Sequence, residues 1–339
     1  MALILAIEST CDETAAAVVE GGRAVLCSVV ATQYELHAKF RGVVPEIASR
    51  AHIESILPVV RQAMESAGVL PADLSAVAVA NRPGLIGSLL VGVTSAKTLA
   101  FAWDKPLVGV DHVHAHLYSA LLDHPDREVL FPAVGAVLSG GHTAIYHLRS
   151  WTDISRIGGT IDDAVGEAYD KVAATLGLGF PGGPAVDALA QTGDPKAVRF
   201  PRTLFARDSL DFSFSGLKTA VLYRTLGPQG LGRKLAEVPP AERADIAAGF
   251  QLACLDVIEE KLRRAAHQFN AQTILVGGGV VSNAALRGRL ARLPVPVLTP
   301  EQKYCTDNAA MIAGLADVLL AGGRVSGLDL DAVTSSWIT

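Results

Sequence analysis

The sequence predicts an α/β protein of two domains, and three observations support this expectation. The chain has 339 residues, which is more than one hydrophobic core usually organises. Half of the residues are hydrophobic and 19% are charged, a balance typical of compact globular proteins and not of disordered ones. Short apolar runs that end in glycine-rich or acidic turns alternate with longer apolar segments of helical spacing. Such alternation is typical of sheets covered by helices.

Composition and charge also narrow the classes of function. No run reaches the ~18 apolar residues of a membrane span, and the start of the chain lacks the basic segment of a signal peptide. The four cysteines are scattered without a C-x-x-C pair, which argues against a disulfide framework or a cysteine-rich zinc site. We therefore expect a cytoplasmic enzyme with no membrane partner. The net charge of −5 argues against binding nucleic acid by bulk charge, although a local basic patch remains compatible with it.

The chain opens with a predicted meander of three strands, at residues 3–7, 15–19 and 24–32. The polar turn 8–14 carries hydroxyl groups and two neighbouring carboxylates, Asp12 and Glu13. A turn of this composition is often only a solvated loop. At a sheet edge it can also hold a metal, or a phosphate through a cation or water.

Helices and buried strands then alternate along the chain. Pro45 suits the first turn of a helix, and the glycine bend after Arg82 leads into another. The expected helices are 45–67, 89–103, 112–122, 284–290 and 309–320. The expected buried strands are 77–80, 107–110, 144–147, 273–276 and an apolar run that starts at residue 133. This second set of strands repeats the opening pattern of strand, polar turn and strand.

Two turns that follow buried strands are bare of side chains, Ser139-Gly140-Gly141 and the triple glycine at 277–279. A flexible turn would explain one such loop but explains two of them poorly. Because glycine lets a flat ring or a phosphate approach the backbone closely, we predict that both turns face one bound ligand. On this reasoning, Gly278→Val should weaken binding of that ligand without unfolding the chain.

Three histidines begin the helix expected at 112–122. His112 and His116 are four residues apart, so a helix places both on one face, where they can bind one divalent metal. His114 faces elsewhere and is not expected to bind the metal. Surface histidines behind an Asp111 cap are the alternative. The residue after the first histidine is Val113 and not glutamate, so the zinc-protease motif is absent.

Acidic residues at two other helix starts are open to more than one interpretation. Asp307 stands where a cap of the last helix belongs, and a cap alone would account for it. Its carboxylate could equally complete a His-His-Asp metal set. Asp162 and Asp163 precede another expected helix, where they would favour the helix dipole.

In combination these segments closely resemble the family of tRNA threonylcarbamoyl-adenosine transferases, once called O-sialoglycoprotein endopeptidases. Each segment is modest alone, but their common order along nearly the whole chain makes the match specific. The matching segments are 7–14, 42–46 with Arg50 and His52, 84–92, His112 with His116, 138–143, 162–171, 181–184, 212–218, 277–283 and 304–308.

The resemblance implies an actin-like fold of two similar α/β lobes with a ligand cleft between them. It places the N-terminal lobe at 1–112, rejoined by 308–339, and the C-terminal lobe at 113–307. It further implies that threonylcarbamoyl-AMP donates its acyl group to the exocyclic amine of the adenosine immediately 3′ of the anticodon, in tRNAs reading codons that start with A. A small-molecule kinase of the same fold and a nucleotide-switched scaffold are the alternatives. Paired histidines argue against the kinase, because kinases of this class hold Mg²⁺ through water and carboxylates.

The resemblance also implies the site residues and the partners. One divalent metal, Fe²⁺ with zinc as the alternative, would be held by His112, His116 and Asp307. The implied donor contacts are Leu138, Ser139, Gly140, Gly141, His142, Asp170, Gly183, Asp187 and Asn283. Our candidates for accepting the amine proton are Asp12 and Glu13. Besides tRNA, the expected partners are a small ATPase and a shorter paralogue of the same fold, which would dock on the apolar helices near residues 45–67 and 85–103.

Three features depart from the pattern of many relatives. Arg41 and Arg82 stand where glycine is common, so their side chains could restrict the neighbouring loops or reach a phosphate. Val137 and Leu138 occupy the place of a metal-binding tyrosine found in archaeal and eukaryotic relatives. The chain therefore resembles the bacterial members, with an open position on the metal.

Overall fold

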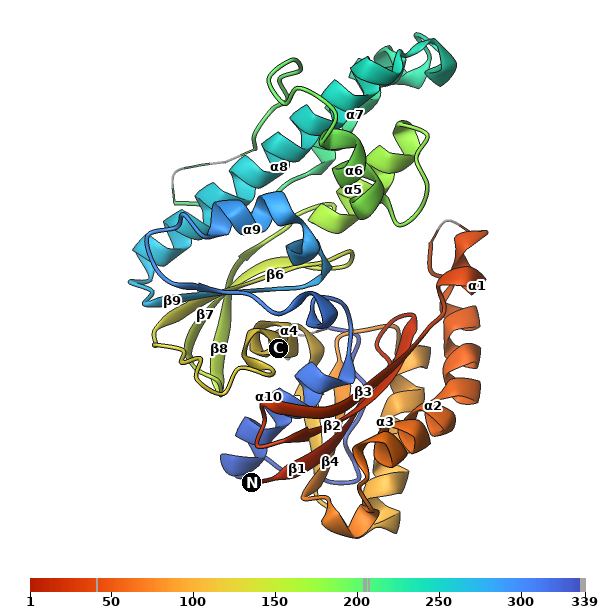
Figure 1. The fold of residues 1–339 in the computed structure, drawn as a ribbon, viewed down its shortest axis with the longest axis vertical. Helices are drawn as coiled ribbons and strands as arrows, with labels where there is room; N and C mark the ends of the chain where they lie inside the picture. The colour runs from red at the N-terminus through yellow and green to blue at the C-terminus, as the bar shows by residue number, and fades with distance from the viewer. Residues whose placement is uncertain (41, 204–205, 207, 336–339) are drawn as a thin grey trace. The chain divides into compact units, whose positions relative to one another are not determined.

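The computed structural model describes residues 1–40, 42–203, 206 and 208–335, so Arg41 lies outside the described residues (Figure 1). The chain forms two compact units. Unit 1 comprises Met1–Glu128, Ser150–Asp153 and Thr299–Thr339, and unit 2 comprises Val129–Arg149 and Ile154–Leu298. The functional lobes expected at 1–112 with 308–339 and at 113–307 stay a prediction.

Unit 1 is built on a five-stranded mixed sheet in the order β3-β2-β1-β4-β5. The strands are β1 (Leu3–Glu8), β2 (Glu13–Glu20), β3 (Ala24–Thr32), β4 (Ala76–Arg82) and β5 (Leu107–Asp111). The first three form the predicted antiparallel meander, and β4 and β5 continue it in parallel with β1. The strands expected from the apolar runs are thereby confirmed.

Helices cover both faces of this sheet, which explains why its central strands are apolar along most of their length. On one face, α2 and α3 contribute to a core with alternate residues of β1, β2 and β4. On the other face, α10 packs on β1 and β2 and contacts α4. The helices of this unit are α1 (Tyr34–Ala38), α2 (Pro45–Ala67), α3 (Ile86–Ala102), α4 (His112–Tyr118) and α10 (Ala309–Ala321).

Unit 2 repeats the same sheet topology, in the order β10-β9-β6-β7-β8. A meander of three strands is again followed by two strands that continue the sheet in parallel beyond the first strand. These strands are β6 (Ala133–Leu138), β7 (Thr143–Ser150), β8 (Asp153–Gly159), β9 (Thr273–Gly277) and β10 (Val297–Leu298). The helices are α5 (Val165–Thr175), α6 (Gly182–Ala190), α7 (Ser215–Leu226), α8 (Pro240–Gln268) and α9 (Ala284–Leu290). Among the described residues, no helix is both long and apolar enough to cross a membrane.

Two helix boundaries differ from the expectation by more than one residue. The helix after Arg82 begins at Ile86 and not at residue 89, because Gly87 does not break it. A Cβ on Gly87 would lie 2.2 Å from Ser49 Oγ, so this glycine lets α3 pack closely on α2. The histidine helix ends at Tyr118 and continues only as a 3₁₀ turn over Ser119–Leu121.

Candidate active site

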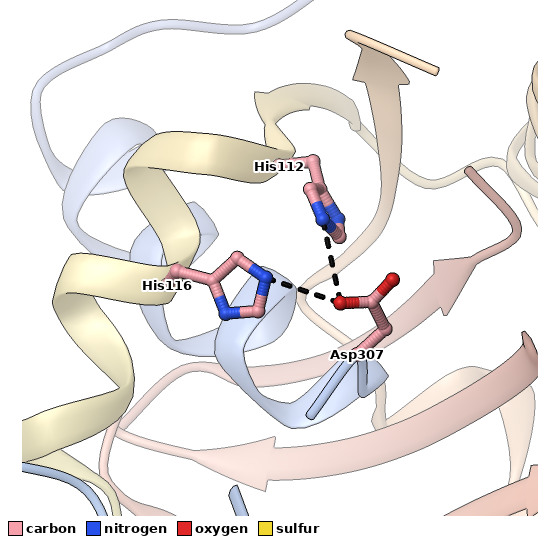
Figure 2. A group of neighbouring side chains, drawn as sticks. All are labelled: His112, His116 and Asp307. Atoms are coloured by element: carbon pink, nitrogen blue, oxygen red, sulfur yellow. Dashed lines mark hydrogen bonds and ion pairs between the residues drawn. The ribbon is translucent and has the colours of Figure 1, made fainter. Parts of the chain in front are cut away.

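Two helix starts in unit 1 bring together the predicted metal ligands (Figure 2). His112 and His116 project from α4, and Asp307 precedes α10. Asp307 Oδ1 lies 3.6 Å from His112 Nε2 and 3.1 Å from His116 Nε2. One ligand atom from each residue lies within 4.8 Å of the others, and His114 is not part of this group.

Helix capping explains why these three side chains converge. Asp111 caps α4, because its Oδ1 accepts from the backbone N–H groups of Val113 at 2.9 Å and His114 at 3.2 Å. The cap of α10 is Asn308, whose side chain accepts from the N–H of Met311 at 3.0 Å. The suggestion that Asp307 caps this helix is therefore wrong. Asn308 has that role, and Asp307 faces the two imidazoles.

Glu8, the last residue of β1, sets the orientation of His112. Its Oε2 accepts from His112 Nδ1 at 2.7 Å, and Thr10 Oγ1 lies 3.3 Å from the same nitrogen. His112 therefore presents Nε2 to Asp307. Burial alone would lower the pKa of His112, but the carboxylates of Glu8 and Asp307 outweigh it and raise this pKa to about 9. Glu8 was not among the site residues predicted from the sequence, although a charged residue at the end of a buried strand is a signal for such a role.

The donor set fits a divalent metal. Two imidazole nitrogens and a carboxylate oxygen are ligands of Zn²⁺ and Fe²⁺, and metal-binding histidines commonly donate their other N–H to a carboxylate, as His112 does to Glu8. Ligand atoms on a metal at about 2.1 Å lie roughly 3.0–3.5 Å apart. The 3.1 Å separation between His116 Nε2 and Asp307 Oδ1 lies within this range, and the 3.6 Å separation between His112 Nε2 and Asp307 Oδ1 lies just above its upper end.

The polar turn between β1 and β2 carries the two candidate proton acceptors, Asp12 and Glu13. Burial, together with the charges of Asp307 and Asp12, raises the pKa of Glu13 to about 9. This arrangement is that of a carboxyl pair in which one member keeps its proton. Burial also raises the pKa of the Cys11 thiol, so this cysteine is not a ready nucleophile.

Arg82, one of the departures from the family pattern, lies close to this site. Its Nε is 3.5 Å from Asp111 Oδ2, the second oxygen of the α4 cap. The guanidinium therefore steadies the residue that begins the histidine helix.

In unit 2, the turn after β6 is closed by its own hydrogen bonds, while its two glycines remain exposed. Ser139 N–H donates to His142 O at 2.8 Å, and His142 N–H donates to Ser139 Oγ at 3.0 Å. A Cβ on Gly140 or Gly141 would meet nothing within 4 Å among the described residues. A Cβ on Gly166, in the first turn of α5, would lie 2.7 Å from Ser139 O. The turn therefore rests on α5 and leaves its two glycines accessible.

The other predicted donor contacts are linked to one another. Asp170 Oδ1 accepts from the N–H of Gly182 at 2.7 Å, at the start of α6, where Gly183 follows. From the same helix, Asp187 Oδ1 accepts from Asn283 Nδ2 and from Gln251 Nε2, both at 2.9 Å. Asn283 also caps α9 through its side-chain oxygen. Gln251 lies inside the long helix α8, and nothing in its sequence neighbourhood pointed to it.

The two glycine turns follow neighbouring parallel strands, because Val137 of β6 pairs with Gly277 of β9. That both turns face one bound ligand stays a prediction. Gly278 has φ +96°, and a Cβ there would lie 2.5 Å from Leu138 O. The expectation that Gly278→Val would spare the fold is therefore wrong, because this position requires glycine for the backbone itself. At Gly140 and Gly141, in contrast, a Cβ would meet no neighbouring atom in the described part of the chain, so the fold itself does not require glycine there.

Comparisons with known proteins agree on one family. The family model for TsaD, tRNA N6-adenosine threonylcarbamoyltransferase, matches residues 24–314. A tRNA N6-adenosine threonylcarbamoyltransferase of Thermomicrobium roseum is 48% identical, over 97% of this chain and 95% of its own length. The enzyme of the same name from Trichlorobacter lovleyi is 49% identical, over 99% of this chain and 96% of its own length.

Solved structures support the fold alone. Full-length HypF in its phosphate- and nucleotide-bound form gives a TM-score of 0.63 at 16% identity, over 96% of this chain and 56% of that one. Component A of the Acidaminococcus fermentans (R)-2-hydroxyglutaryl-CoA dehydratase gives a TM-score of 0.52 at 16% identity, over 94% of this chain and 98% of that one. These proteins share the actin-like fold, which the repeated sheet topology of the two units also displays.

The matches cover nearly the whole chain, and nothing in them favours the kinase alternative. The chain therefore belongs to the family of tRNA N6-adenosine threonylcarbamoyltransferases, acyltransferases that pass a threonylcarbamoyl group to the exocyclic amine of an adenosine in tRNA.

Proposed function

We propose that His112, His116 and Asp307 hold one divalent metal, Fe²⁺ in preference to zinc. The support is the convergence of two imidazoles and one carboxylate, the ligand set of non-haem Fe²⁺ sites with open positions. When bound, such a metal would neutralise charge on the phosphate of the leaving AMP. The ligands themselves are prearranged by the Asp111 and Asn308 caps and by the Glu8 contact.

The donor threonylcarbamoyl-AMP is proposed to bind in unit 2, at the residues linked around the two glycine turns. The open Gly140 and Gly141 would let its phosphate or sugar approach backbone N–H groups. Asp187 Oδ1 accepts from Asn283 and Gln251, and Oδ2 accepts a longer bond of 3.4 Å from Gln191 Nε2. Oδ2 is therefore the oxygen that we expect to accept from a ribose hydroxyl. The full proposed set is Leu138, Ser139, Gly140, Gly141, His142, Asp170, Gly183, Asp187 and Asn283, with Gln251 as a supporting residue.

In the proposed reaction, the adenosine N6 attacks the carbamoyl carbon, a C–N bond forms, and the C–O bond to AMP breaks. The attacking amine loses one proton, which a carboxylate must accept. Asp12 is our candidate, because the neighbouring Glu13, with its pKa raised to about 9 by burial and by Asp307, remains protonated at neutral pH. Replacing Asp12 with asparagine should therefore slow transfer much more than Glu13→Gln.

We further propose that the chain works in the cytoplasm with tRNA, a shorter paralogue of the same fold and a small ATPase. Its net charge of −5 is poorly suited to capturing tRNA unaided at physiological salt. The outer faces of α2 and α3 carry exposed apolar side chains at helical spacing, namely Ile53, Leu57, Ile86 and Leu90. Such a surface suits helix-to-helix docking of the paralogue.

The metal proposal is tested by the metal content and activity of three alanine variants. His112→Ala and His116→Ala should lose bound iron and threonylcarbamoyl transfer, whereas His114→Ala, on the same helix, should keep bound iron. Iron is measured by mass spectrometry of the purified protein, and transfer by nucleoside analysis of tRNA after reaction with threonylcarbamoyl-AMP and the partner proteins. Full iron retention in the first two variants would remove the triad.

A further inference from the structure

His52 of α2 is fully buried, and each of its ring nitrogens has a hydrogen-bond partner. Its Nε2 lies 3.0 Å from Cys11 O, and its Nδ1 lies 2.7 Å from Thr14 Oγ1. A carbonyl oxygen only accepts, so Nε2 carries the proton and Nδ1 accepts from the threonine hydroxyl. Burial lowers the pKa of His52, which favours this neutral form. The ring therefore ties α2 to the turn between β1 and β2 at Cys11 and to the start of β2 at Thr14.

Besides the Thr10 N–H, which donates to Glu8 Oε1, and the Ser9 hydroxyl, which donates to Ser88 O, three backbone carbonyls anchor this turn. Thr10 O accepts from the N–H of Leu85 at 2.9 Å, and Asp12 O accepts from the N–H of Gln33 at 3.1 Å. Between them, Cys11 O accepts from His52 Nε2 at 3.0 Å and from Ser88 Oγ at 3.3 Å. Three consecutive carbonyls are thus fixed to three different segments, and only the central one depends on side chains.

The anchored turn adjoins the metal group on one side and the candidate base on the other. Glu8 is the last residue of β1 and pairs with Ala15 of β2, so the sheet fixes its backbone. Thr10, which contacts His112 Nδ1, and Asp12 lie outside the paired residues of these strands. Thr10 is also held by the bond from its N–H to Glu8 Oε1, so Asp12 is the functional position that relies most on the carbonyl anchors.

We propose that His52 is a positioning residue for threonylcarbamoyl transfer, acting through its bond to Cys11 O to fix the backbone that presents Asp12. This inference rests on the proposed role of Asp12. It predicts a loss of turnover, without loss of the metal, when the bond to Cys11 is removed. The metal is expected to remain because the sheet holds Glu8.

Substitution of His52 by glutamine or asparagine separates the roles of its two ring nitrogens. The side-chain nitrogen of glutamine reaches the position of Nε2 and can still donate to Cys11 O. Asparagine reaches only the position of Nδ1 and can still accept from Thr14. We expect His52→Gln to keep kcat within about threefold of the parent and His52→Asn to lower kcat by roughly 10- to 100-fold, with the KM for the donor unchanged within about twofold. Both variants should retain iron.

Ile56→Ala is the matched control, because Ile56 lies one turn further along the buried face of α2 and only packs in the core. It should lower the melting temperature without changing kcat. If the two His52 variants lose kcat equally, or if Ile56→Ala loses it as His52→Asn does, the role is structural and the inference falls.

A double-mutant cycle distinguishes failure of this inference from failure of the proposed base. If His52 acts through Asp12, the double variant His52→Asn/Asp12→Asn should be no slower than Asp12→Asn alone. Additive losses would overturn the inference while leaving the role of Asp12 intact. Full activity of Asp12→Asn would instead remove Asp12 as the base, and with it the route through which His52 is proposed to act.

Discussion

Replacing Glu8 with glutamine is expected to weaken metal binding, because the carboxylate uses both oxygens and an amide has only one. Glu8 Oε1 accepts from the N–H of Thr10 at 2.6 Å, and Oε2 accepts from His112 Nδ1 at 2.7 Å. A glutamine can satisfy one of these donors, and its NH₂ group then faces the other. If NH₂ faces His112, the imidazole must keep its proton on Nε2, the nitrogen that is needed for the metal.

The magnitude follows from burial and charge. The side chains of His112 and Glu8 are 4% and 1% exposed, so water cannot replace the lost contact. A hydrogen bond to a charged group contributes about 1.5–3 kcal/mol, which corresponds to a roughly 10- to 150-fold loss of metal affinity. The loss is measured by competition with a chelator of known affinity.

Glu20→Gln is the control for this experiment, because Glu20 is an exposed carboxylate at the other end of β2. It should leave metal affinity unchanged. An unchanged affinity in Glu8→Gln, or an equal loss in Glu20→Gln, would refute the reasoning that Glu8 prepares His112 for the metal.

Three further predictions concern unit 2. Gly140→Val should keep the melting temperature but weaken donor binding, measured by calorimetry. Gly278→Ala should instead lower the melting temperature by several degrees, because Gly278 has φ +96° and a Cβ there would lie 2.5 Å from a backbone oxygen. Gln251→Leu should reduce donor affinity, since Gln251 holds Asp187 at 2.9 Å, and unchanged affinity would contradict the proposed network. Burial, with help from a neighbouring arginine, lowers the pKa of Lys261 to about 8, so its charged form destabilises the native state at pH 7 and this penalty fades as pH rises from about 8 toward 10.5. Lys261→Met removes this penalty together with the bond from Nζ to Ser209 O at 2.7 Å, so the change in melting temperature should be more favourable at pH 7 than at pH 10. An equal change at both pH values would refute the argument.

The sequence was most informative where local rules decide the structure. Strands of the first meander and helices such as α2 and α9 follow from apolar periodicity, proline at a first turn and flanking glycines. The pair His112 and His116 follows from helical spacing in the same way. These features need no knowledge of distant parts of the chain.

Contacts between distant segments could not be predicted from local rules. Asp162 was expected to favour the helix that follows it, but it accepts from Ser213 Oγ, Ser215 Oγ and the N–H of Phe214, at the start of α7. Asp163 instead pairs with Lys171 and Lys218. Acidic residues before a helix can thus serve another helix fifty residues away, and sequence spacing carries no signal for the difference.

The charges around the proposed metal depend both on local helix geometry and on contacts between distant segments. Helices α4 and α10 direct their N-termini toward the ligand group, and the positive ends of helix dipoles disfavour a cation. Asp111 is committed to its own helix and to Arg82. Glu8 and Asp307 both contact the imidazoles, and their two negative charges match one divalent ion. Because this charge balance needs both carboxylates, neutralising either one should cause loss of the metal and not only a change in the geometry of its ligands. The Glu8→Gln measurement tests this reasoning without replacing a proposed metal ligand.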